Sequence, residues 1–226
     1  MTITIQVEVW TILIVTVMLC VLVVFLGNKI KKSDPAKKPE GAANVGLLLV
    51  QFIDGMVHDN MDESYVKHLG PVIGTIGLYI LCSNLISLIG LPNPTANYSV
   101  TLTLALCAWV IIEGTQIKVK HVGPFLKGFL DPFFLFLPIN IFGELSPILS
   151  MSMRLFGNIL VGGILMELVY NATSLLSGLV PVIGQINFMG PVLAPALHAY
   201  FDVFAGVLQT YIFIMLTTVL AKSKSE

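Results

Sequence analysis

Hydrophobic residues along this chain gather into long runs that are separated by short polar stretches. The first run covers residues 9–26 and is just long enough for one transmembrane helix. The residues before it carry Glu8 but no lysine or arginine, and no small-x-small cleavage site follows. We therefore expect a retained N-terminal transmembrane helix within 1–27 rather than a signal peptide.

Residues 28–67 form a polar connector before the next long run. The positive-inside rule places this connector in the cytoplasm, because it is rich in lysine: Lys29, Lys31, Lys32, Lys37 and Lys38. Residues 44–58 carry apolar side chains at helical spacing. This pattern predicts a short amphipathic helix at the membrane interface.

Residues 68–117 form a predicted transmembrane hairpin. The stretch 68–112 has no formally charged residue, and about 45 residues are too many for one crossing and suit two. A cluster of turn residues from Gly90 to Pro94 separates the two helices. Lysines then mark 118–131 as a second cytoplasmic loop, with Glu113 near the interface.

Residues 132–226 contain the last two predicted helices, at 132–170 and 191–221, and a short cytoplasmic tail. About 35 helical residues extend roughly 50 Å, whereas the hydrocarbon core is about 30 Å thick. We expect a long, strongly tilted hairpin, or a first helix bent at Pro138 and Pro147. Three lysine clusters on the cytoplasmic side require an even number of crossings between each pair of clusters. One initial helix and two hairpins therefore give five crossings, with the N-terminus outside and the C-terminus in the cytoplasm.

Composition supports an all-α membrane protein with about five transmembrane helices. Hydrophobic residues make up 56% and charged residues 11%, against roughly 25% charged in globular domains, and the mean hydropathy is +0.90. The net charge of −1, without a basic, aromatic-rich cluster, argues against nucleic acid. The sequence has no phosphate loop, metal-ligand spacing or Ser-His-Asp set, so we predict no bound nucleotide, metal, cofactor or soluble catalytic centre.

Arg154 is the only arginine in the chain and lies in its longest apolar region. An arginine near the middle of a bilayer costs about 2.5–3.5 kcal/mol on insertion scales and stays protonated at any reachable pH. An intramembrane charge is by default a functional hypothesis. The structural alternative is an ion pair with Glu144 or Asp202 inside the helix bundle.

Other polar side chains accompany Arg154 on the last two helices. On an ideal α-helix His198, Asp202 and Gln209 fall within about 40° of one another and form one polar stripe. The helix before it carries polar residues at several depths: Glu144, Ser150, Asn158 and, on nearly the opposite face from Arg154, Glu167. A water-filled ion path requires such residues, although the serine can also bond back to its own helix.

Two stretches resemble subunit a of the rotary F-type ATP synthase, the stator of its membrane sector. They are PINIFGELSPILSMSMRLFGNIL, with a specific Arg-Leu-Phe-Gly-Asn motif, and DVFAGVLQTYIFIMLTTVL. The resemblance covers the whole chain in length, five-crossing layout and order of elements. It implies a non-catalytic, ion-translocating subunit in a bacterial cell membrane, with the c-ring, the peripheral-stalk subunit b and membrane lipid as partners.

The resemblance also implies residue roles. Arg154 is expected to be the essential arginine that faces the ion-carrying carboxylates of the c-ring. The expected pathway residues are Asn158 and Gln209 beside the arginine, Glu144 and Ser150 in the cytoplasmic half-channel, Asp202 with His198 in the outer half-channel, and Glu167 as a further candidate.

One position departs from the family pattern. Many members carry a glutamate nine residues after the arginine that corresponds to Arg154, where this chain has Gly163. Many also carry a histidine seven residues before the glutamine that corresponds to Gln209, where this chain has Asp202. A glycine leaves room for an acid from the facing helix, so we expect Asp202 to supply the outer carboxylate. The coupling ion, H⁺ or Na⁺, stays open. The alternative function is a non-rotary ion channel or secondary transporter, although the two later hairpins show no internal repeat.

Overall fold

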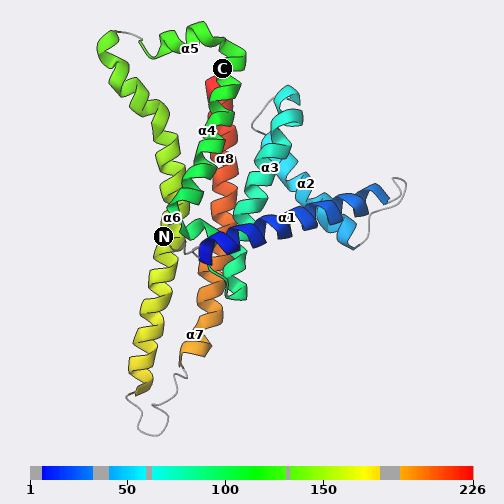
Figure 1. The fold of residues 1–226 in the computed structure, drawn as a ribbon, viewed down its shortest axis with the longest axis vertical. Coiled ribbons are helices and arrows are strands. Elements are labelled where there is room, and N and C mark those ends of the chain that lie inside the picture. Colours follow the sequence, from blue (N-terminus) through cyan, green and yellow to red (C-terminus); the bar gives the residue numbers. More distant parts are fainter. Residues whose placement is uncertain (1–6, 33–40, 60–62, 131–132, 179–188, 226) are drawn as a thin grey trace, which may run out of the picture.

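The computed structural model describes residues 7–32, 41–59, 63–130, 133–178 and 189–225, and every regular element within them is helical (Figure 1). In chain order the elements are α1 (Val7–Lys32), α2 (Ala42–His58), α3 (Glu63–Leu85), η1 (Ile86–Ile89), η2 (Pro94–Ala96), α4 (Tyr98–Lys120), α5 (Val122–Gly128), η3 (Phe134–Phe136), α6 (Leu137–Gly178), α7 (Met189–His198), η4 (Ala199–Phe204) and α8 (Ala205–Ser225). Parts of the expected layout rest on residues that lie outside the described ones, namely residues 1–6 and also Lys37, Lys38, Asp131 and Pro132.

The expected number of membrane spans is confirmed. Among the described residues, five helical stretches are long and apolar enough to cross a membrane: Val9–Lys32, Val66–Ile89, Tyr98–Lys120, Phe134–Gly178 and Gly190–Lys224. A shorter apolar helix, Ala43–His58, lies between the first two of them in the chain, as the sequence predicted. The loop after the third span differs from expectation, because it contains the short helix α5.

The turn of the first hairpin follows from its residues. Gly90 adopts a left-handed φ of 80°, which favours glycine. Two asparagines then begin the next helical turns: the side chain of Asn93 accepts from the N–H of Thr95 (3.0 Å), and that of Asn97 accepts from the N–H of Ser99 (2.9 Å). Asparagine suits this position because its side chain satisfies an N–H that lacks an intrahelical partner.

The apolar core lies where α3, α4, α6 and α8 meet. α4 packs against both α6 and α8, and α3 packs against α8. Buried side chains from all four helices fill this contact: Ile73, Ile80, Ala108, Ile112, Leu155 and Ile214. The core therefore fixes the last two spans against the earlier hairpin.

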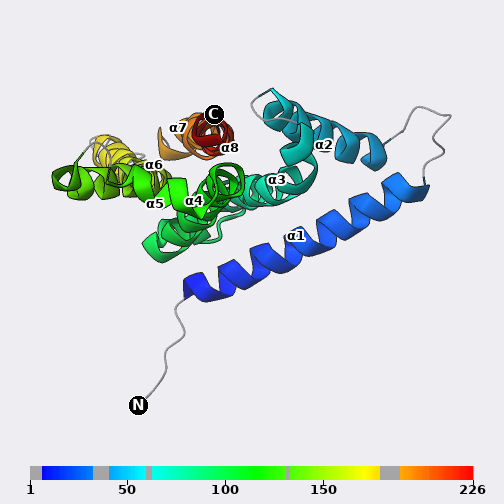
Figure 2. The ribbon, with the colours of Figure 1, turned by 90° about the horizontal axis from the view of Figure 1, so that it is seen from above.

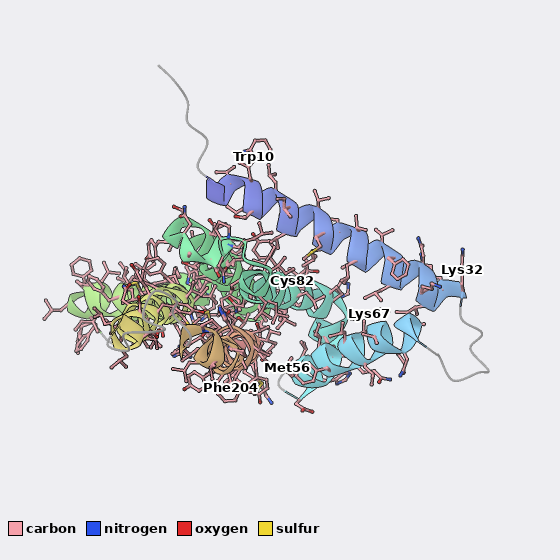
Figure 3. The ribbon with its side chains drawn as sticks, turned by 90° about the horizontal axis from the view of Figure 1, so that it is seen from below. Trp10, Lys32, Met56, Lys67, Cys82 and Phe204 are labelled. Carbon is pink, nitrogen blue, oxygen red and sulfur yellow. The ribbon has the colours of Figure 1, made fainter. Side chains whose placement is uncertain are left out.

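α1 lies to one side of this core, where it contacts α2 and α3 (Figure 2). Apolar side chains project from its surface between Trp10 and Lys32, which lie at opposite ends of the helix (Figure 3). A helix that is apolar all round suits a lipid environment. In Figure 1 the axis of α1 crosses those of α6 and α8 at a large angle. The tilt of the last hairpin relative to the membrane stays a prediction from its length.

α6 is longer than the sequence pattern indicated. It has 42 residues and runs to Gly178 instead of ending near Tyr170, so it extends about 63 Å. It begins only at Leu137, because the short helix η3 precedes it. The helix passes through Pro147 without interruption, and its axis bends in the first half (Figure 1), as expected for a proline inside a helix.

The partner of α6 is not the single regular α-helix that the sequence predicted. It consists of α7, the six-residue π-helix η4 and α8. A π-turn holds more residues than an α-turn, and such segments are frequent at functional sites. Here the π-helix contains Asp202 and directly follows His198, so the irregular turn falls on two of the candidate residues.

Candidate functional site

Arg154 lies on the exposed side of α6, among exposed apolar residues such as Met153. Within the part of the chain that the structure describes, its guanidinium forms no hydrogen bond or ion pair. The two carboxylates considered as its partners are engaged elsewhere: Asp202 contacts His198, and Glu144 contacts Lys224. The structural alternative of an ion pair to Glu144 or Asp202 is therefore wrong, and the charge stays available to a group outside the chain.

A cavity of about 580 Å³ lies beside the second half of α6. We call it the outer cavity. Four of the candidate residues line it: Asn158, Glu167, His198 and Asp202. Glu167 thus reaches the same cavity as Asp202 although it lies far around the helix from Arg154.

Three side chains form a row in the outer cavity. Nδ1 of His198 lies 2.6 Å from Oδ2 of Asp202, and the hydroxyl of Tyr170 lies 3.4 Å from Nε2 of His198. With Asp202 ionised, Nδ1–H donates to the carboxylate and Nε2 is left to accept from the Tyr170 hydroxyl. The row links α6 to the segment around η4 and offers a continuous path for a proton or a coordination surface for a cation.

The predicted polar stripe of three residues is broken. His198 and Asp202 lie together, but Gln209 is buried, with 6% of its surface exposed, and is not among the residues that line the outer cavity. The prediction assumed 3.6 residues per turn throughout, whereas the π-helix η4 between His198 and Gln209 changes the helical phase.

Sequence reasoning missed a set of polar residues from the first hairpin that also reaches the outer cavity. Asn84, Ser87 and Asn93 line it. The amide of Asn84 donates to the backbone carbonyl of Gly206 (3.3 Å), and the hydroxyl of Thr95 lies 2.7 Å from Oδ1 of Asn93. Asparagines inside an otherwise apolar run were the available signal, because an unpaired buried amide is costly.

Two glycines shape this region in opposite ways. A Cβ built on Gly206 would lie 2.8 Å from Cβ of Asn84, so Gly206 permits the close approach of α3 and α8. A Cβ on Gly163 would meet no atom within 4 Å, and Gly163 lines the outer cavity with Asp202. The open space expected at Gly163 is therefore present.

A second cavity, of about 500 Å³, lies beside the start of α6 and is bounded by α4 and α5. We call it the inner cavity. Glu144 lines it together with Gln116, Lys120 and Asn140. Pro147 has no N–H to donate to the carbonyl of the residue four positions earlier, and that residue, Gly143, also lines the cavity.

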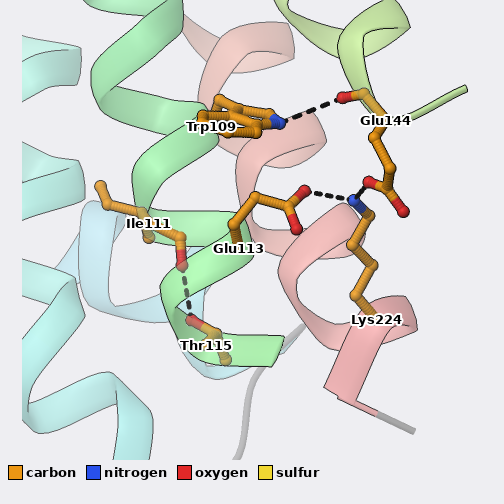
Figure 4. A network of polar contacts seen from close by, with 6 residues as sticks. All are labelled: Trp109, Ile111, Glu113, Thr115, Glu144 and Lys224. Atoms are coloured by element: carbon orange, nitrogen blue, oxygen red, sulfur yellow. Dashed lines mark hydrogen bonds and ion pairs between the residues drawn. The ribbon is translucent and has the colours of Figure 1, made fainter. Parts of the chain in front are cut away.

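Glu144 is also part of a charged cluster at the inner cavity (Figure 4). The Lys224 ammonium contacts carboxylate oxygens of both Glu113 and Glu144, and the indole N–H of Trp109 donates to the backbone carbonyl of Glu144 (3.0 Å). Glu113, which the sequence predicts to lie near the membrane interface, is buried within the protein, with 5% of its surface exposed. Ser150 is exposed and is not among the residues that line either cavity.

The order of these features along α6 is simple. The inner cavity contacts the helix up to Glu144, Arg154 follows ten residues later, and the outer cavity begins at Asn158. At ~1.5 Å per residue the arginine lies about 15 Å beyond Glu144. Arg154, which has no ion-pair partner among the described residues, thus lies between two cavities that each contain polar lining residues.

These features define a multi-pass, all-helical membrane protein whose long apolar helices border two cavities with polar lining residues. The family model described as the ATP synthase A chain matches residues 9–222, and the chain belongs to that family. It is therefore a membrane subunit of an ATP synthase.

Curated relatives agree with this assignment. ATP synthase subunit a of Limosilactobacillus reuteri is 33% identical over 200 residues, which cover 83% of this chain and 80% of that protein. The subunit a of a Sulfurihydrogenibium species is 34% identical over 213 residues, 92% of both chains. A protein of Propionigenium modestum described as ATP synthase subunit a, sodium ion specific, is 32% identical over 187 residues, 72% of this chain and 59% of that protein.

Proposed function

We propose that this chain is the ion-translocating stator subunit of a rotary ATP synthase. In this proposal the outer and inner cavities are two offset half-channels that serve the carboxylates of the c-ring, and Arg154 separates them. The observation that carries the proposal is the order along α6, where an exposed, unpaired arginine lies between the two cavities. The resemblance of the Arg-Leu-Phe-Gly-Asn motif supports the same roles.

The outer cavity would load the ring. An ion that enters from outside passes the row formed by Tyr170, His198 and Asp202, with Asn158, Asn84 and Glu167 as further polar lining. It then neutralises a ring carboxylate at the face of α6. A neutral carboxyl group turns through lipid at much lower cost than a charged one.

The inner cavity would unload the ring. A carboxyl group that returns from the far side of the ring meets the path that leads to Glu144 and releases its ion there, at the cytoplasmic side. The ionised carboxylate then faces Arg154. Because the guanidinium stays positive, it favours the ionised form and repels a cation that would cross directly between the cavities. Once the ring is present, Asn158 and Gln209 would act beside this pair, and Ser150 would act with Glu144 in the cytoplasmic half-channel.

The flow of ions down their electrochemical gradient supplies the energy for rotation. Moving one elementary charge across 100 mV is worth about 2.3 kcal/mol, so several ions per turn drive synthesis in the attached soluble sector. This chain itself binds no nucleotide in the proposal. Its partners are the c-ring, the peripheral-stalk subunit b and lipid, and its N-terminus lies outside the cell membrane and its C-terminus in the cytoplasm.

Replacing Arg154 tests the proposal. Arg154→Ala should abolish ATP synthesis driven by an ion gradient and ATP-driven ion pumping, because nothing then holds the ring carboxylate ionised between the cavities. The measurement uses membrane vesicles that contain the whole complex, with co-purification of the c-ring as the check of assembly.

The control and the contrary outcomes are equally direct. Arg154→Lys keeps a positive charge on a flexible stem without the planar fork of the guanidinium, and it should retain more coupled activity than the alanine variant. Gradient-driven ATP synthesis by an assembled Arg154→Ala complex would refute the proposal. Purification of the chain without any c-ring would favour a channel or transporter.

A further inference from the structure

Lys224, near the C-terminal end of α8, lies between two acidic side chains from two other helices (Figure 4). Its ammonium contacts Glu113 of α4 and Glu144 of α6. No sequence pattern connects these three positions, because Lys224 is 111 residues from Glu113 and 80 residues from Glu144. The contact joins the ends of three membrane spans at the inner cavity.

Burial and charge make this cluster more than a surface ion pair. The side chain of Lys224 is 17% exposed, that of Glu113 6% and that of Glu144 27%. One ammonium faces two carboxylates, and Oε2 of Glu113 and Oε1 of Gln116 are buried acceptors without a hydrogen-bond partner within the described residues. The site thus holds more acceptors than Lys224 satisfies, and a buried carboxylate is costly without a cation.

Glu144 is shared between this cluster and the inner cavity. It lines the cavity, whereas Lys224 and Glu113 are not among the lining residues, so the ammonium reaches the carboxylate from the α8 side. The other charged side chain that lines the cavity is Lys120. A cation that arrives through the cavity and the ammonium of Lys224 therefore approach the same carboxylate from two directions.

We propose that Lys224 is a tethered counter-ion that competes with the coupling ion for Glu144 at the cytoplasmic end of the pathway. When the ammonium contacts Glu144, an ion released from the ring leaves readily. When an ion enters from the cytoplasm to be pumped outward, it must first displace the ammonium, which keeps its contact with Glu113. This inference deepens the proposed function and rests on it, because it assumes that ions pass Glu144.

Removing the charge of Lys224 tests the competition. In Lys224→Gln complexes, the cytoplasmic concentration of the coupling ion that gives half-maximal ATP-driven pumping should fall by about fivefold or more, since fivefold is the upper end of the effect of an exposed ion pair and this one is largely buried. The ion is supplied as pH steps or as added NaCl on the cytoplasmic face of inverted vesicles. The matched control is Lys222→Gln, two residues away on the same helix and exposed, which should leave this concentration unchanged. An unchanged concentration in Lys224→Gln would overturn the inference.

Glu113→Gln separates competition from a merely structural contact between helices. Without Glu113, the ammonium has Glu144 as its remaining partner in the cluster, so the half-maximal ion concentration should rise, opposite to the change in Lys224→Gln. A structural contact would instead make both variants less heat-stable and less active in the same direction. Arg154→Ala distinguishes the two failures: if it abolishes coupling while neither Lys224→Gln nor Glu113→Gln shifts ion dependence, only the role of Lys224 is wrong.

Discussion

Asp202 and Gly163 face the same cavity from opposite helices of the last hairpin. Asp202 is held by His198, and Gly163 leaves open space where many family members are expected to carry a glutamate. The cavity thus has a carboxylate from the segment around η4, in addition to Glu167 of α6. At the scale of the residue, we propose that Asp202 takes the place of the glutamate expected at position 163, an exchange of one carboxylate between the two helices.

The exchange predicts a compensation. Asp202→Asn should lower ATP-driven pumping by about tenfold or more, because the outer cavity loses the acid next to His198. Adding Gly163→Glu to that variant should restore a large part of the rate, since the new side chain extends into open space. Pumping by vesicles, normalised to assembled complex, is the measurement.

Gly163→Gln in the same Asp202→Asn background is the control for the size of the new side chain. This variant has the shape of the glutamate without its charge, and it should not restore pumping. Equal rescue by glutamine and glutamate would mean that filling the space, rather than returning a carboxylate, is what the cavity needs.

At the scale of the element, the contact between α3 and α8 positions the outer cavity. It depends on Gly206, where a Cβ would lie 2.8 Å from Cβ of Asn84. Because a Cβ atom cannot rotate away, the two helices have to separate when both positions carry one. The same separation would break the hydrogen bond from Asn84 to the carbonyl of Gly206.

Gly206→Ala should therefore destabilise the assembled subunit by about 1–3 kcal/mol, the usual size for overpacking. When the detergent-solubilised complex is heated and release of the chain is measured, the variant chain should be released at a lower temperature. Gly114→Ala is the matched control, because a Cβ on that helical glycine meets no atom within 4 Å. If both variants behaved alike, the close approach at Gly206 would have no energetic importance.

The sequence predicted the elements better than their internal irregularities. Length and hydropathy gave five spans and the amphipathic helix, because a bilayer sets how long an apolar helix must be. They did not give the π-helix around Asp202, which contacts α3, and so they placed Gln209 on the same face as Asp202. They also treated the region around Asn93 only as a turn, because its place in the same cavity as Asp202 depends on how distant parts of the chain pack.

At the scale of the whole molecule, the two cavities lie toward opposite ends of the last hairpin. The ends of α4 and α8 lie with α5 at one end of the molecule, and α7 lies at the other with the end of α6 (Figure 1). The positions of Arg154, Asp202 and Glu144 as candidates came from the sequence. Their division between two separate cavities, and the link from Glu144 to Lys224, required the fold.

The central claim is that these cavities open to opposite sides of the membrane, and thiol accessibility tests it most directly. Single cysteines replace Gly163 in the outer cavity and Gly143 in the inner cavity, where a Cβ meets no atom within 4 Å. The native Cys20, Cys82 and Cys107 are replaced by alanine. A small, membrane-impermeant thiol reagent is then added to one side of oriented vesicles that contain the whole complex. We expect Gly163→Cys to react only from outside and Gly143→Cys only from the cytoplasmic side; reaction of both from the same side, or of either from both sides, would contradict two half-channels separated by Arg154.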